Sequence, residues 1–164
     1  MEVYLIRHGI AAERGTYVND DERPLTEEGE KKTRQVAKRL RTLGLKLDPI
    51  LTSPLVRARQ TAEILLNVGF GPTLQVVSFL SPNGDIEDWL DWLANWQRSP
   101  NSALTLVGHE PDLSSWAEIL VWGSVQGAFT LKKGGVIGLQ LPESGKPIGN
   151  SSLFWLTPPR LLLD

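Results

Sequence analysis

The N-terminal stretch Val3-Tyr4-Leu5-Ile6-Arg7-His8-Gly9 joins an apolar run to a polar end. Four consecutive apolar residues are typical of a strand whose two faces are both covered, as in a parallel sheet flanked by helices. Arg7 and His8 follow where this strand ends. Ligands of open parallel sheets bind at the carboxyl ends of strands, so these two side chains are candidates for a binding or catalytic site.

Strands and helices alternate over the first 120 residues. Short apolar runs predict further strands at residues 50–52, 74–77 and 103–107. Helical spacing and capping residues predict helices after Thr26, after Ser53-Pro54, over about 85–96, and along Leu113, Trp116 and Leu120. This alternation predicts an α/β fold, a three-layer sandwich in which helices flank a mostly parallel central sheet.

The pattern changes after Gly123. Extended segments near 128–131, 135–141 and 152–157 are separated by Gly, Pro and Ser, which predicts antiparallel or edge strands. No repeat, low-complexity tract or linker interrupts the chain. We therefore expect residues 1–164 to form a single domain.

The composition argues against several classes of protein. The 164 residues carry 17 Lys and Arg against 19 Asp and Glu, a net charge of −2, so no basic excess indicates a nucleic-acid or membrane partner. The sequence contains no Cys, which excludes disulfides, thiolate zinc sites and a Cys nucleophile. No apolar run is long enough for a spanning helix or a signal peptide, so a cytoplasmic domain is expected.

Three segments place unusual side chains after predicted strands. Arg7 and His8 follow the first strand, Arg57 lies shortly after the second, and His109 follows the strand at 103–107. The arginines offer planar, permanently charged donors that match phosphate oxygens. A neutral imidazole can attack phosphorus, and a second can stabilise the charge that develops on the transferred group. The residues alone do not distinguish which histidine is the nucleophile.

Other interpretations of the same residues are weaker. The two histidines lack the HxH or HExxH spacing of a metal site, and no GxxxxGK[ST] or GxGxxG motif indicates a nucleotide loop. Trp89, Trp92 and Trp96 share one helical face, which predicts packing in the core or against a partner. The acidic stretch Asp20-Asp21-Glu22 is typical of a solvated loop.

These motifs resemble those of the histidine phosphatase superfamily, which has the phosphoglycerate-mutase-like fold. The matching blocks are Leu5-Ile6-Arg7-His8-Gly9, Thr52-Ser53-Pro54 with Arg57-Ala58 and Gln60-Thr61-Ala62, and Val107-Gly108-His109. A further element, Arg23-Pro24-Leu25-Thr26 with Gly29, is also similar. The compact length and the stretch His109-Glu110-Pro111-Asp112 most resemble the SixA type of phosphohistidine phosphatase. The resemblance is good over residues 2–120 and loose over the last forty.

The resemblance implies roles for four residues. His8 is expected to be the nucleophile that is transiently phosphorylated, with Arg7, Arg57 and His109 lining the phosphate pocket. Neither a metal nor a nucleotide cofactor is expected. The implied enzyme is a metal-independent phosphatase that acts on phosphohistidine in a phosphotransfer protein, with no nucleic-acid or membrane partner.

One departure from the family pattern concerns the general acid. Many relatives carry a Glu in a Leu-x-Glu context, whereas this chain reads Phe79-Leu80-Ser81-Pro82-Asn83-Gly84-Asp85. Asp85 or Glu87 are possible substitutes. A missing acid matters most for alkyl phosphates, whose alkoxide leaving group needs a proton. The SixA type resembles this chain in lacking that acid.

The interval between the second and third blocks leaves little chain for a lid over a small substrate. Only residues 62 to 107 lie between the second block and the strand end before Gly108, and this interval already holds a predicted strand and helix. This favours phosphohistidine presented on a protein. The alternatives are a phosphatase for small phosphomonoesters, such as sugar or nucleotide phosphates, and a non-catalytic module that senses phosphate.

Overall fold

The computed structural model describes residues 1–45, 48–96 and 102–163. Its centre is a six-stranded sheet in the order β3-β2-β4-β1-β5-β6. Four strands run parallel: β1 (Glu2–Arg7), β2 (Ile50–Thr52), β3 (Leu74–Val76) and β4 (Ala103–Gly108). Two more extend the sheet antiparallel beyond β1: β5 (Val136–Gln140) and β6 (Ser152–Thr157).

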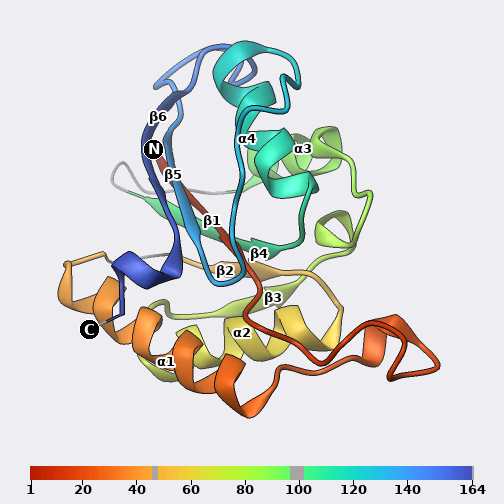
Figure 1. Cartoon of the computed structure of the whole chain (residues 1–164). Helices are drawn as coiled ribbons and strands as arrows, with labels where there is room; N and C mark the ends of the chain where they lie inside the picture. The colour runs from red at the N-terminus through yellow and green to blue at the C-terminus, as the bar shows by residue number, and fades with distance from the viewer. Residues whose placement is uncertain (46–47, 97–101, 164) are drawn as a thin grey trace.

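Helices cover both faces of the sheet, as the alternation predicts (Figure 1). Helices α1 (Glu27–Thr42) and α2 (Val56–Asn67) lie on one face, and α3 (Ile86–Asn95) and α4 (Asp112–Trp122) lie on the other. The three-layer α/β sandwich with a mostly parallel sheet is therefore confirmed. Among the described residues, none of the helices has the length and apolar character needed to cross a bilayer.

The alternation of side chains along β1 explains how one strand supports two cores. Val3 and Leu5 pack with residues of α3 and α4, whereas Tyr4 and Ile6 pack with residues of α1 and α2. All four side chains are almost completely buried. A strand covered on both faces has no solvent-facing side, which is why its sequence is uninterrupted in apolar residues.

Most predicted helix ends agree with the structure. The Thr26 side chain accepts a hydrogen bond from the Gly29 N–H at the start of α1, and Gly44 adopts a φ of 81° just beyond its end. The start of α2 differs from the prediction. Ser53 does not cap this helix, which begins at Val56 after Leu55.

The expected extended segment at 128–131 is not a strand of the sheet, unlike the segments that became β5 and β6. Its backbone groups are bonded to side chains instead. The Glu118 carboxylate, buried in α4, accepts hydrogen bonds from four backbone N–H groups, those of Gln126, Gly127, Ala128 and Phe129. A segment whose backbone groups are held this way does not form ladder hydrogen bonds.

The tryptophan face of α3 divides into two parts. Trp89 is fully buried and stacks on Trp116 of α4, with ring centroids 5.8 Å apart. Trp92 and Trp96 stack on each other and are only partly buried against the same core. The core interpretation therefore holds for Trp89, and the outer pair covers the edge of that core.

Candidate active site

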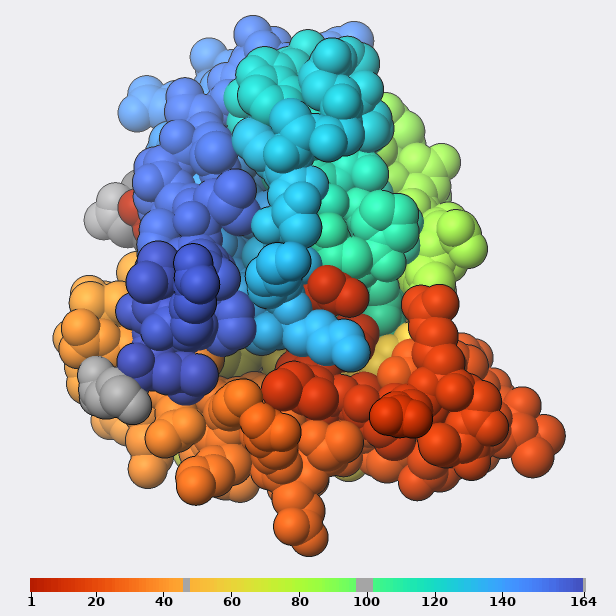
Figure 2. Space-filling model, viewed as in Figure 1, coloured from red at the N-terminus to blue at the C-terminus, as the bar shows by residue number. Residues whose placement is uncertain are grey.

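The ends of two central strands bring the histidines together. In the parallel pairing of β1 with β4, Arg7 lies opposite Gly108, so the residues that follow, His8 and His109, emerge side by side. Their ring centroids are 5.2 Å apart. Together with Arg57, from the first turn of α2, all four predicted site residues line one cleft of about 670 Å³. In the space-filling view the N-terminal residues, drawn in red, lie against the light-blue segment that follows α4 (Figure 2).

His8 has a defined orientation and protonation. Its Nδ1 lies 2.8 Å from the Gly9 carbonyl oxygen, which only accepts hydrogen bonds, so Nδ1 carries the proton and Nε2 keeps its lone pair. Burial is the main cause that lowers the pKa of His8 to about 3; the Gly9 bond opposes it, and His109, Arg57 and Arg7 act in the same direction as burial. A neutral imidazole with a free Nε2 can act as a nucleophile.

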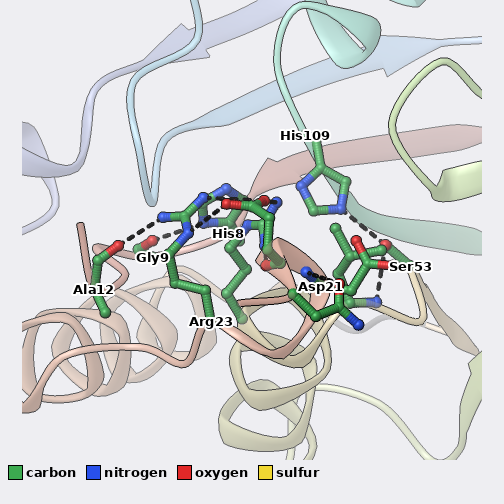
Figure 3. Close-up of polar contacts among 11 residues, drawn as sticks. His8, Gly9, Ala12, Asp21, Arg23, Ser53 and His109 are labelled. Atoms are coloured by element: carbon green, nitrogen blue, oxygen red, sulfur yellow. Dashed lines mark hydrogen bonds and ion pairs between the residues drawn. The ribbon is translucent and has the colours of Figure 1, made fainter. Parts of the chain in front are cut away.

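His109 is held by Ser53. The His109 Nε2 lies 2.8 Å from Ser53 Oγ, which also accepts a hydrogen bond from the Leu55 N–H (Figure 3). Burial, together with the charges of Arg57 and Arg7, lowers the pKa of His109 to about 4. The hydroxyl predicted to cap a helix thus orients an imidazole at the cleft. This role depends on β4 lying next to β2, which is a tertiary arrangement.

Arg23 and Asp20 also line the cleft, and neither was predicted as a site residue. Arg23 is only 5% exposed, and its Nε lies 2.9 Å from Asp20 Oδ1, while its Nη1 donates to the Ala12 carbonyl oxygen. Asp20 Oδ2 also lies 3.1 Å from Arg57 Nη2. The sequence signal for Arg23 was its place in the element Arg23-Pro24-Leu25-Thr26. No sequence signal pointed to Asp20, because an acidic run in a polar loop is usually solvated.

Arg7 is held by the segment that follows α4. Its Nη1 donates to the Leu131 carbonyl oxygen at 2.9 Å, and the Gly134 N–H bonds to the carbonyl oxygens of Arg7 and His8. The Leu131 N–H in turn lies 3.4 Å from Glu110 Oε2. The C-terminal third of the chain therefore fixes the end of β1, although the motifs lie in the first 110 residues.

The family model for the histidine phosphatase superfamily (branch 1) matches residues 3–103 of this chain. The chain belongs to this superfamily. Its sequence is 48% identical over 164 residues to an uncharacterized protein of Picosynechococcus, with 99% of each chain covered. It is 27% identical to the phosphohistidine phosphatase SixA of Escherichia coli, with 97% of this chain and 94% of SixA covered.

A solved structure supports the same assignment over the last forty residues as well. The protein histidine phosphatase SixA complexed with tungstate is 27% identical to this histidine phosphatase, with a TM-score of 0.83 and 99% of each chain covered. The predicted resemblance to the superfamily and its SixA type is therefore confirmed at the level of fold and family. The C-terminal strands, which resembled the family only loosely in sequence, also follow this fold.

The proposed substitutes for the general acid do not lie in the cleft of this histidine phosphatase. Asp85 caps α3, where its side chain accepts a hydrogen bond from the Glu87 N–H, and neither residue is among those that line the cleft. The sequence left open whether either of them protonates the leaving group, and their places in the structure do not favour that role. Pro82, at the third position of the Leu-x-Glu pattern, does line the cleft.

Three carboxylates line the cleft, and two of them are already bound to neighbouring side chains or backbone groups. Arg23 holds the pKa of Asp20 below its usual range, so Asp20 stays ionised. The Glu110 oxygens accept hydrogen bonds from the Ser114 N–H and hydroxyl. The third carboxylate belongs to Glu13, which is exposed.

Cationic side chains outnumber the carboxylates around the cleft. The five cations are Arg7, Arg14, Arg23, Arg57 and Lys133. With both imidazoles neutral, this lining has a positive balance that favours an oxyanion. Within residues 1–45, 48–96 and 102–163, no group of three His, Cys, Asp or Glu side chains is arranged to hold a metal ion.

Proposed function

We propose that this protein hydrolyses phosphohistidine on a phosphotransfer protein through a phosphorylated His8 intermediate, with Arg7, Arg57 and His109 binding the phosphoryl group. The observation that carries the proposal is the combination of a neutral His8, whose Nε2 is free to attack, with carboxylates that are occupied or exposed. Likeness to SixA, solved with the tetrahedral oxyanion tungstate, supports the same substrate class. A cytoplasmic location and independence of metal remain predictions.

The reaction takes two displacements at phosphorus. In the first, the His8 Nε2 lone pair forms a bond to phosphorus while the phosphorus–nitrogen bond of the substrate breaks and its electron pair goes to the departing imidazole. In the second, a water oxygen forms a bond to phosphorus while the bond from phosphorus to His8 Nε2 breaks and its electron pair returns to Nε2; inorganic phosphate leaves and the proton lost by the water passes to solvent. Arg57, Arg7 and His109 stabilise the charge on the equatorial oxygens in both steps.

The leaving group decides whether an acid is needed. An imidazole whose second ring nitrogen is protonated leaves as a neutral ring, whereas an alkyl phosphate leaves as an alkoxide that needs a proton. Asp20 is held ionised by Arg23, and Glu110 accepts hydrogen bonds at both oxygens, so neither is a ready proton donor. These contacts favour phosphohistidine over phosphomonoesters.

The test compares two substrate classes with purified protein in the absence of metal. One is a phosphotransfer domain phosphorylated on histidine, and the other is a panel of small phosphomonoesters. We expect phosphate release from the domain, little from the esters, and a loss of about 10⁴–10⁶-fold in the His8→Ala variant, the scale found when a nucleophile is removed. Activity of His8→Ala within tenfold of the wild type would refute the proposed intermediate.

The second candidate is a phosphatase for small phosphomonoesters. Glu13 favours it, because among the described residues this exposed carboxylate of the cleft lining pairs with no arginine and caps no helix. Faster hydrolysis of an ester than of the phosphorylated domain, lost in Glu13→Gln, would establish this function instead. Tight phosphate binding without turnover of either class would indicate a sensing module.

A further inference from the structure

A loop with apolar residues at its tip stands beside the cleft. Residues 13–19 lead away from the cleft lining, where Glu13 and Arg14 lie, and this segment projects from the body of the molecule at the lower right of Figure 1. Tyr17 is 43% exposed and the Val18 side chain is fully exposed. Adjacent apolar side chains that face solvent next to a binding cleft offer a protein partner a surface to pack against.

The loop is anchored at both ends by the cleft itself. At one end, Arg23 donates to the Ala12 carbonyl oxygen, and at the other end Asp20 bonds to both Arg23 and Arg57. Within the loop, the Thr16 N–H and hydroxyl both bond to the Glu13 carbonyl oxygen. The position of Tyr17 and Val18 is therefore tied to the arginines that face the phosphate site.

The depth of the site constrains what can reach it. His8 is 5% exposed and His109 is 3% exposed, so both rings lie below the rim. A phosphorylated histidine extends from the surface of its protein by only the length of one side chain. For its phosphoryl group to reach the two rings, the surface around that histidine must therefore touch the rim. The rim carries the exposed cations Arg14 and Lys133, which take part in none of the ion pairs between described residues. Tyr17 and Val18 lie in the exposed loop that leaves the rim at Arg14 and returns to it at Asp20.

We propose that Arg14, Tyr17, Val18 and Lys133 form a docking rim for the protein that carries the phosphohistidine. The charges favour a partner whose surface beside the phosphorylated residue is acidic, with an apolar side chain that packs on Tyr17 and Val18. This proposal rests on the proposed function and identifies what a protein substrate gains over free phosphohistidine: contacts outside the phosphate site that lower KM.

The test removes the apolar tip and compares a protein with a small substrate. The double variant Tyr17→Ser, Val18→Ser is assayed on a histidine-phosphorylated phosphotransfer domain with an acidic face and on free phosphohistidine. Leu43→Ser is the matched control, because Leu43 is also half exposed but follows the end of α1, outside the cleft lining. We expect KM for the domain to rise at least fivefold in the double variant, with kcat and both constants for free phosphohistidine within twofold of the wild type.

Each result has one meaning. An unchanged KM for the domain in the double variant, with both substrates turned over by the wild type, would overturn the docking rim and leave the proposed function intact. An equal loss on both substrates would also overturn it, because the loop would then act on the phosphate site. Failure of the wild type to hydrolyse phosphohistidine in either form would overturn the proposed function, and the docking rim with it.

Discussion

Asp20 holds the Arg57 guanidinium at two points. The Asp20 carbonyl oxygen accepts a hydrogen bond from Arg57 Nη1 at 2.8 Å, and the carboxylate oxygen Oδ2 lies 3.1 Å from Nη2. The same carboxylate binds Arg23. Two like charges at one cleft repel each other, and a shared anion offsets that repulsion and fixes the direction of both guanidiniums.

Replacement of Asp20 by Ala is expected to lower kcat/KM roughly five- to tenfold, because Arg23 and Arg57 lose the shared carboxylate and keep only their bonds to main-chain carbonyl oxygens. The effect is small for a charged contact, since Asp20 is about half exposed and solvent screens it. Steady-state kinetics on the phosphorylated domain measure it. Asp21→Ala removes the same charge from the neighbouring exposed residue and should stay within twofold. Equal kinetics for the two variants would refute the positioning role.

Arg57→Ala is expected to weaken phosphate binding by about 1.5–3 kcal/mol, the scale of a charge-assisted hydrogen bond, or roughly 10- to 150-fold in affinity. The measurement is the inhibition constant of inorganic phosphate. Arg59→Ala, on the exposed side of the same helix, is the control. An inhibition constant that does not change in Arg57→Ala would remove this residue from the phosphate site.

Ser53→Ala is expected to lower kcat about fivefold with little change in KM. The loss of one neutral hydrogen bond is about 1 kcal/mol, and it leaves His109 free to turn away from the phosphoryl group. Ser115→Ala, in α4 and outside the cleft lining, should retain wild-type kinetics. A kcat for Ser53→Ala within 1.5-fold of the wild type, roughly the scatter of such kinetic comparisons, would show that His109 does not depend on this hydroxyl.

Stability should fall as the pH falls below 6.5. The pKa values of His8 and His109 are lowered to about 3 and about 4 in the folded protein, so below 6.5 the unfolded chain binds protons that the folded chain does not. The expected loss between pH 6 and 5 is roughly 1 kcal/mol per histidine, measured as the free energy of unfolding in urea. His109→Asn should lose about half of this pH dependence, and an unchanged slope would contradict the buried neutral state.

Glu118→Gln is expected to lower the free energy of unfolding by roughly 2–4 kcal/mol. Burial alone would raise the pKa of Glu118, but four backbone N–H groups outweigh burial and hold its pKa below the usual range. An amide places donors against some of these N–H groups and leaves buried groups unpaired. Urea unfolding measures the loss, with Glu63→Gln on the exposed side of α2 as control. Equal stability of the two variants would contradict this account.

The strands were predictable because their signal is local. A strand covered on both faces is apolar over most of its length, and the segments that became β1, β2 and β4 satisfy this condition. The edge strand β3 contains Gln75 and is only partly covered, so its short apolar run was the weaker signal. The predicted grouping of Arg7, His8, Arg57 and His109 followed from the same strands, since the carboxyl ends of parallel strands meet at one edge of the sheet. The segment at 128–131 failed as a strand because distant side chains bind its backbone.

The sequence by itself determined the alternating strands and helices, the four clustered side chains and the family, since each depends on residue type and order along the chain. Only the tertiary structure decided what those side chains contact. The Gly9 carbonyl oxygen places the proton of His8 on Nδ1. Ser53, predicted to cap a helix, bonds to His109 instead, and the Asp20 carboxylate binds both Arg23 and Arg57. These contacts depend on strand order and loop packing, which bring together groups that no local pattern relates.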